Sequence, residues 1–164
     1  MSTAEMMRFF IAIIFFPLIC SAQVGMEQWR LHMPNSKAID IAEGDGKVFI
    51  AFEKGVAEYD IASDEISVWD IINGLSDINV SSIYFSESGG ALFIGYENGN
   101  IDKLKNNRVT NIPAIELAQI QGSKKINNIK EYNGLLYFAT GFSIVELDPD
   151  KEEVKRWSQT CFRG

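Results

Sequence analysis

The side chains that most often carry catalysis or bind metal ions are scarce in this sequence. Its 164 residues include a single histidine, His32, and two cysteines, Cys20 and Cys161. A metal site or an acid–base pair needs several such groups together, and His32 has no matching cluster. The sequence identifies no partner that would activate Cys161 as a nucleophile. We therefore predict a protein that is not an enzyme, with no catalytic, metal-binding or cofactor-binding residue.

Two acidic turns and one triplet are the remaining places where chemistry is conceivable. Asp148-Pro149-Asp150 and Asp45-Gly46 lack the alternating carboxylates of a calcium loop, so we interpret both as turns. Asn79-Val80-Ser81 matches the acceptor pattern for asparagine glycosylation, although such triplets are common by chance. Glycine loops that would cradle a phosphate are absent from the sequence.

The segment Ile72–Asp77, with the sequence Ile-Asn-Gly-Leu-Ser-Asp, is the strongest candidate for recognition. The first interpretation is a turn that ends one unit of structure and aims the next. Connecting loops also line one face of a protein, where ligands and partners dock. Both interpretations stay open, and no individual binding residue is assigned.

Residues 1–22 have the three parts of a secretory signal peptide. Arg8 precedes the apolar run Phe9–Ile19, and Cys20-Ser21-Ala22 offers a cleavage site with small residues. The run is shorter than the roughly 20 residues that a membrane-spanning helix needs. We expect an exported protein without a transmembrane segment after cleavage. Acylation at Cys20 is the alternative, disfavoured by the bulky Ile19 before it.

The mature chain, residues 23–164, is acidic and holds one cysteine. Removal of the signal takes away one acid and one base, so the formal net charge stays at −7. Proteins that bind nucleic acid neutralise phosphates with clustered Lys and Arg, which this sequence lacks. A single cysteine cannot form an intramolecular disulfide, so packing must stabilise the fold. We therefore expect no nucleic-acid partner.

The elements of the mature chain repeat with a period of 44 residues. Three apolar runs, which start at Lys47, Ala91 and Leu135, each have an aromatic third residue and a small fifth residue. A strand and then a glycine turn precede each run, and Asn133-Gly134 is the strongest hairpin signal among these turns. Two further turns and two further strands complete each repeat. Four strands per repeat of 40–50 residues indicate a blade of a β-propeller.

The sequence therefore predicts an all-β fold: a partial β-propeller of about three four-stranded antiparallel blades. The expected blades span about 38–70, 80–112 and 125–158. In a β-sandwich with similar strands, the unequal loops would break the constant spacing of the runs. Residues 113–124 form either one helical turn or a long loop, and 28–33 form a strand that could clasp a last blade.

Three blades are too few to close a ring, because propellers have at least four. An open stack would expose apolar faces on its terminal blades. We therefore expect the chain to be a fragment of a longer protein. Assembly of two chains into a six-bladed ring is the rival hypothesis.

Four pieces of the sequence resemble a known family: Trp29, Asn73–Asp77, Ile94–Asp102 and Lys125–Ile129. They are similar to the N-terminal propeller of the PorZ-like proteins of the type IX secretion system of Bacteroidetes. More distantly, they resemble the periplasmic propellers of hybrid two-component regulators. The second resemblance implies the alternative function, a sensory domain that binds a glycan-like ligand.

The resemblance to PorZ-like proteins implies a scaffold in a complex that attaches secreted cargo to lipopolysaccharide. It also implies protein partners from that complex, with lipopolysaccharide or another glycan bound through parts outside this chain. The implied location is the periplasm or the cell surface, in association with the outer membrane. An enzyme built on a propeller is the least favoured function, because the sequence lacks paired catalytic groups.

Overall fold

The computed structural model describes residues 37–158, which form twelve strands and no helix. The predicted signal peptide and the predicted strand at 28–33 lie outside the described residues. The strands are β1 (Ala38–Gly44), β2 (Lys47–Phe52), β3 (Gly55–Asp60), β4 (Glu65–Trp69), β5 (Val80–Ser86), β6 (Ala91–Tyr96), β7 (Ile101–Lys105), β8 (Arg108–Asn111), β9 (Ile126–Tyr132), β10 (Leu135–Thr140), β11 (Ile144–Asp148) and β12 (Glu153–Ser158).

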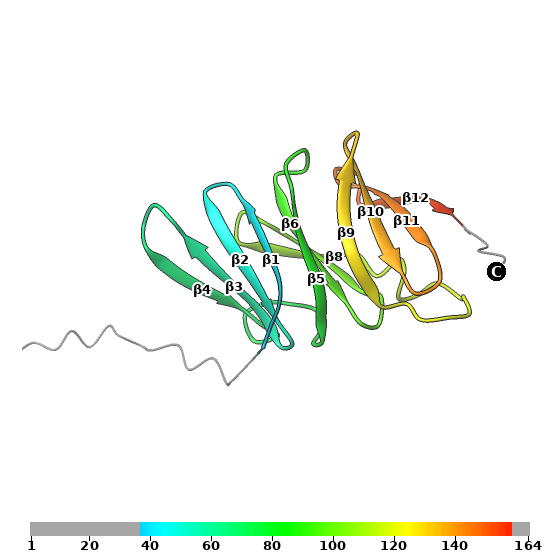
Figure 1. Cartoon of the computed structure of the whole chain (residues 1–164), viewed down its shortest axis with the longest axis horizontal. Coiled ribbons are helices and arrows are strands. Elements are labelled where there is room, and N and C mark those ends of the chain that lie inside the picture. The colour runs from blue at the N-terminus through cyan, green and yellow to red at the C-terminus, as the bar shows by residue number, and fades with distance from the viewer. Residues whose placement is uncertain (1–36, 159–164) are drawn as a thin grey trace, which may run out of the picture. The chain divides into compact units, whose positions relative to one another are not determined.

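The strands form three separate four-stranded sheets, each an antiparallel meander in chain order (Figure 1). We call β1–β4 blade 1, β5–β8 blade 2 and β9–β12 blade 3. The predicted fold class, an all-β partial propeller with three blades, is confirmed. The inner strands β1, β5 and β9 are neighbours across the blades, whereas β4, β8 and β12 lie at the outer edges.

The tight turns of the hairpins follow from residues that tolerate positive φ angles. Asn133 and Gly134 have φ angles of 51° and 73°, and they join β9 to β10. Asp45 and Gly46, at 52° and 71°, make the corresponding turn of blade 1. Left-handed conformation at both central positions matches the right-handed twist of the strands. The predicted hairpins at these two sites are confirmed.

Each inner strand carries an irregularity at the same place. The register shifts between Ala38 and Asp40 in β1 and between Val80 and Ser82 in β5, and β9 shifts opposite Ala139 and Thr140. A bulge of this kind bends a strand and redirects its side chains. The irregularity therefore recurs once in each blade, near the start of its inner strand.

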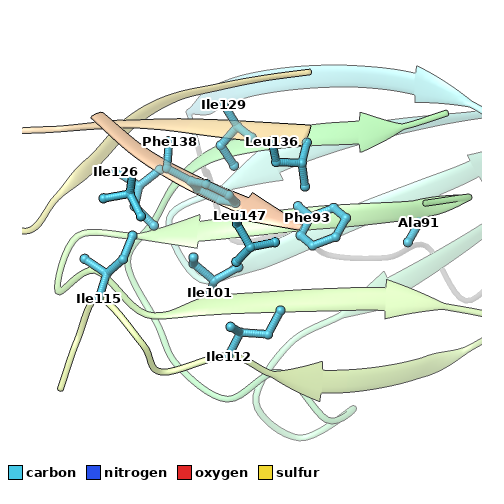
Figure 2. Packing of buried hydrophobic residues seen from close by; sticks show 11 residues of the cluster. Ala91, Phe93, Ile101, Ile112, Ile115, Ile126, Ile129, Leu136, Phe138 and Leu147 are labelled. Atoms are coloured by element: carbon cyan, nitrogen blue, oxygen red, sulfur yellow. The ribbon is translucent and has the colours of Figure 1, made fainter. Parts of the chain in front are cut away.

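The core lies between the blades. One cluster joins blades 1 and 2, and another joins blades 2 and 3. Every residue of β6 is buried, whereas β2 and β10 alternate between buried and half-buried positions. Blade 2 is flanked on both faces within the described chain, and blades 1 and 3 on one face each. Figure 2 shows the second cluster, where Phe93 of blade 2 and Phe138 of blade 3 meet edge to face at 6.5 Å.

The small fifth residue of the repeated run permits close approach of the next blade. A Cβ atom added at Gly95 would lie 2.6 Å from Cγ2 of Ile126, on the inner strand of blade 3. The predicted close approach is confirmed at this position.

The connection between blades 2 and 3 is a loop with one helical turn. The amide of Leu117 donates to the carbonyl of Pro113 at 2.9 Å. Ile115 from this turn is fully buried in the second cluster. The loop therefore packs as part of the core.

Candidate functional site

The inner strands of the three blades line a groove with a volume of about 350 Å³. An inner strand pairs with only one neighbour, so its second edge faces this groove. The side chains that give the groove its chemistry are Asp40, Glu43, Tyr84, Glu87, Asn128 and Lys130. Sequence reasoning missed all of them as site residues, because the groove forms only where three blades meet.

Asp40 fixes the first two inner strands to one another. Its Oδ2 accepts hydrogen bonds from Ser82 Oγ at 2.9 Å and from the amide of Ile83 at 3.0 Å. Its Oδ1 accepts a bond from the amide of Ile41 at 2.9 Å. Bonds to an ionised acceptor are stronger than neutral ones. One wall of the groove is therefore held rigidly across the blade boundary.

The other wall combines an aromatic ring with a cation. Nζ of Lys130 lies 5.8 Å from the ring centroid of Tyr84, within the range of a cation–π contact. Glu43 and Glu87 add carboxylates from blades 1 and 2. Such a mixed lining offers donors and acceptors to a polar ligand or a peptide. It holds no histidine or cysteine.

The predicted recognition loop is anchored to blade 2. The amide of Ser76 donates to Asp102 Oδ2 of blade 2 at 2.8 Å. Within the connection itself, the amide of Asn73 donates to Asp70 Oδ1 at 2.8 Å. The Asp77 carboxylate accepts a bond from the Asn98 side chain. These contacts favour the first interpretation of the loop, a turn that ends blade 1 and orients blade 2. The loop also presents Ile72, which is 91% exposed at its tip.

Asp102 is the buried charge that organises this junction. Its Oδ2 also accepts the Tyr96 hydroxyl at 2.7 Å, and its Oδ1 accepts Asn111 Nδ2 at 3.0 Å. Burial, followed by the nearby charge of Asp102, raises the pKa of Tyr96 well above its ordinary value. Two of the segments that carry the family resemblance, Asn73–Asp77 and Ile94–Asp102, are thus in contact where the interblade loop meets blade 2. Sequence reasoning did not foresee this role of Asp102.

The two acidic turns are local hydrogen-bonded turns. In the turn that contains Asp148-Pro149-Asp150, Asp148 Oδ1 accepts the amides of Asp150 and Lys151 at 3.1 and 3.3 Å. Its Oδ2 lies 3.0 Å from Lys155 Nζ. The hydrogen bond from Lys155 is the main cause that lowers the pKa of Asp148. Within residues 37–158, no group of three or more His, Cys, Asp or Glu side chains is arranged to hold a metal ion.

The glycosylation triplet lies where the chain enters β5. Asn79 has a φ angle of 62°, and its carbonyl accepts the amide of Glu97 at 3.1 Å. The Ser81 hydroxyl donates to the carbonyl of Ile126 at 2.7 Å. The serine of the triplet therefore links blade 2 to blade 3. A structural role accounts for its hydroxyl.

Several residues weighed in the sequence fall outside the described part of the chain. They are His32, Cys20 and Cys161. Along the described residues, no helix has the length and apolar character needed to cross a membrane.

Comparisons with known proteins place this geometry in a family. Residues 48–163 match the family described as the PorZ N-terminal beta-propeller domain of TSS9. Among solved structures, PorZ of Porphyromonas gingivalis superposes with a TM-score of 0.69 and 31% identity. It is described as an essential bacterial surface component of the type IX secretion system of that human oral bacterium. The match covers 74% of this chain and 17% of PorZ.

A second similar structure is the extracellular domain of BT4673 from B. thetaiotaomicron, a one- or hybrid two-component system. It has a TM-score of 0.62 and 18% identity, and the match covers 75% of this chain and 17% of that chain. At this identity the likeness concerns the fold alone. No curated protein matches this chain. Because the PorZ family matches most of the chain and the blades agree with its propeller, the chain belongs to the family of PorZ N-terminal β-propeller domains of the type IX secretion system.

Proposed function

We propose that this chain is a non-enzymatic propeller scaffold in a type IX secretion or cell-surface attachment complex. It is exported by the signal peptide at residues 1–22, and it acts in the periplasm or at the cell surface of a member of the Bacteroidetes. Its partners are proteins of that complex, with lipopolysaccharide or another glycan bound through other parts of the assembly.

The observation that carries this proposal is the family match over residues 48–163. The packing supports it as well. The blade junctions are held by buried hydrogen bonds such as those of Asp102, which suits a rigid platform. The chain spans 17% of the PorZ structure, so the activity of a whole PorZ protein enters only as part of this proposal.

Site-specific photo-crosslinking in a bacterium with a type IX secretion system tests the proposal. A photoreactive residue in place of Glu87, at the rim of the groove, is expected to capture proteins of the secretion complex. The same residue in place of Asp150, exposed on the outer turn of blade 3, is the matched control. A chain that stays in the cytoplasm, or identical captures from both positions, would contradict the proposal.

The second candidate is a sensory propeller that binds a glycan-like ligand. The groove favours it, because Tyr84 and Lys130 present a ring and a cation beside hydrogen-bonding groups. Titration calorimetry with lipopolysaccharide and with soluble polysaccharides tests it. Binding that the Tyr84→Ala variant loses, without captured secretion proteins from position 87, would favour the sensor over the scaffold.

A further inference from the structure

Asp40 takes up amide donors from two neighbouring inner strands. Its Oδ2 accepts the amide of Ile83 in β5 at 3.0 Å, and its Oδ1 accepts the amide of Ile41 in β1 at 2.9 Å. Ile41 and Ile83 hold equivalent positions, opposite Ile50 and Ile94 of the second strands. Both line the groove. The amides of these two residues are therefore already bonded where their strands reach the groove.

The carbonyl oxygens of the same two residues remain as acceptors. In an antiparallel pair, the amide and the carbonyl of one residue point to the same edge of its strand. The inner strands pair with no further strand at the edge that faces the groove. Ile41 and Ile83 therefore present carbonyl oxygens to the groove, while Asp40 binds their amides. At these two positions the backbone contributes acceptors without the matching donors.

The charged side chains of the groove add further acceptors. The groove holds three acids and one base, which are Asp40, Glu43, Glu87 and Lys130. Glu43 and Glu87 are exposed, and neither takes part in the ion pairs formed within residues 37–158. An ionised carboxylate accepts hydrogen bonds and donates none. The groove is therefore negatively charged and rich in acceptors.

Lys130 shows how a cation lies in this groove. Its Nζ is 5.8 Å from the centroid of the Tyr84 ring, whose face attracts positive charge. The two residues hold equivalent positions on β9 and β5, opposite Tyr137 and Phe93. The lysine thus reaches across the boundary between blades 2 and 3. An ammonium group of the chain itself therefore occupies the aromatic part of the groove.

The geometry points to a groove that binds the guanidinium or ammonium group of an arginine or lysine side chain, presented by a protein partner. Both groups carry only donors, so the free carbonyls and carboxylates of the groove match them. The face of the Tyr84 ring supplies a cation–π contact. A volume of about 350 Å³ is near the lower end for ligand pockets, which suits one long side chain.

This inference rests on the proposed function for the source of the ligand, because a scaffold meets such side chains on its partner proteins. Anionic groups, such as the phosphates of a lipid headgroup, do not fit the groove. Its carboxylates would repel them, and its one amine lies over the Tyr84 ring. Lys130 acts as an internal competitor, which a cation of the partner displaces from the ring.

Titration calorimetry with a basic peptide tests the inference on the full chain. The probe is a capped pentapeptide in which arginines alternate with glycines, used at low ionic strength. Lys130→Met removes the internal competitor and should tighten binding by about threefold. Lys151→Met removes the same charge from an exposed position on the outer turn of blade 3 and serves as the control. It should not tighten binding by more than half as much.

The acids of the groove are tested in the opposite direction. Glu43→Gln combined with Glu87→Gln should weaken binding of the peptide by about fivefold. Glu65→Gln combined with Asp150→Asn changes the net charge equally, at exposed positions on outer strands and turns, and should have a much smaller effect. All four positions are exposed, so each variant should keep the unfolding midpoint of the unaltered chain.

Three outcomes would overturn the inference. They are absence of peptide binding, equal effects of the groove variants and their controls, and tighter binding of the free amine spermidine than of the peptide. The first two deny a cation site in the groove, and the third denies that a protein side chain fills it. The scaffold survives such a result if position 87 still captures secretion proteins. If the groove binds the peptide but position 87 captures none, the scaffold fails instead.

Discussion

Single buried polar side chains hold the blades of this protein to one another. Asp102 binds the interblade loop through Ser76 and binds its own blade through Tyr96 and Asn111. The half-buried Asp40 and the buried Lys103 bond similarly across the two blade boundaries. A buried charge is costly unless its partners satisfy it. Removal of such a residue should therefore cost more than removal of an exposed acid.

The first prediction concerns Asp102. Asp102→Ala leaves the Ser76 amide and the Tyr96 hydroxyl without their acceptor, so we expect a loss on the order of 3 kcal/mol in the free energy of unfolding. Urea denaturation measures it. Asp150→Ala, at an exposed site on an outer turn, is the control and should change stability by less than about 0.5 kcal/mol. Similar losses for the two variants would show that the junction does not depend on the buried carboxylate.

The second prediction concerns pH and Asp148. The folded state holds the pKa of this carboxyl below its ordinary value of 3.8, chiefly through Lys155. A lowered pKa means that the stabilisation is complete above pH 3.8 and is lost as the pH falls through the folded value. Asp148→Asn should therefore lose stability at neutral pH and lose less than the unaltered chain on acidification. Parallel acid denaturation curves for the two proteins would contradict this assignment.

At the scale of elements, the inner strand of one blade packs on the second strand of the blade before it. The contact between Ile126 of β9 and Gly95 of β6 leaves no room for a Cβ atom. The bulges in the inner strands alter their register, and Asp40 and Ser81 bond across the boundaries near these bulges. The spacing of blades 2 and 3 therefore depends on the absence of a side chain at Gly95.

The third prediction tests this spacing. Gly95→Ala should destabilise the chain by about 1–3 kcal/mol, because the added methyl group overlaps the Ile126 side chain. Ile126→Ala in the same chain should remove part of that penalty, so the double variant is less destabilised than the sum of the single ones. Chemical denaturation of the four proteins gives the coupling. Strict additivity would rule out the steric explanation.

The two terminal blades differ from the middle blade at the scale of the whole molecule. Ile41 of blade 1 is 66% exposed, whereas Ile83, at the equivalent position of blade 2, is 3% exposed. The difference arises because blade 1 has no preceding sheet among the described residues. Terminal faces of stacked repeats need a cover or a polar surface.

The fourth prediction compares these two isoleucines. Ile83→Ala should cost about 2–5 kcal/mol of stability, because it opens a cavity between blades 1 and 2. Ile41→Ala should change stability by less than about 0.5 kcal/mol in this chain. Thermal and urea unfolding measure both. Equal losses would indicate that another part of the protein covers the first blade.

The local pattern of the sequence is sufficient to predict the four-stranded blades. The period of the apolar runs and the turn residues, such as Asn133-Gly134, predict strands, hairpins and fold class, since these depend on residues close together in the chain. The small residue at position 95 also predicts a close neighbour. The short segments that resemble PorZ-like proteins indicate the family, and the family match over residues 48–163 then shows it.

The groove and the blade junctions could not be predicted in this way. Asp40, Tyr84 and Lys130 come from three different repeats, and they meet only because the inner strands lie side by side. The pairing of Lys103 with Glu152 likewise depends on which turn faces which strand. The sequence by itself determined the strands, turns and fold class, because these follow from its 44-residue period and from residues close together in the chain. Only the tertiary structure decided which side chains of different blades meet, because contacts between residues distant in sequence do not appear in that period.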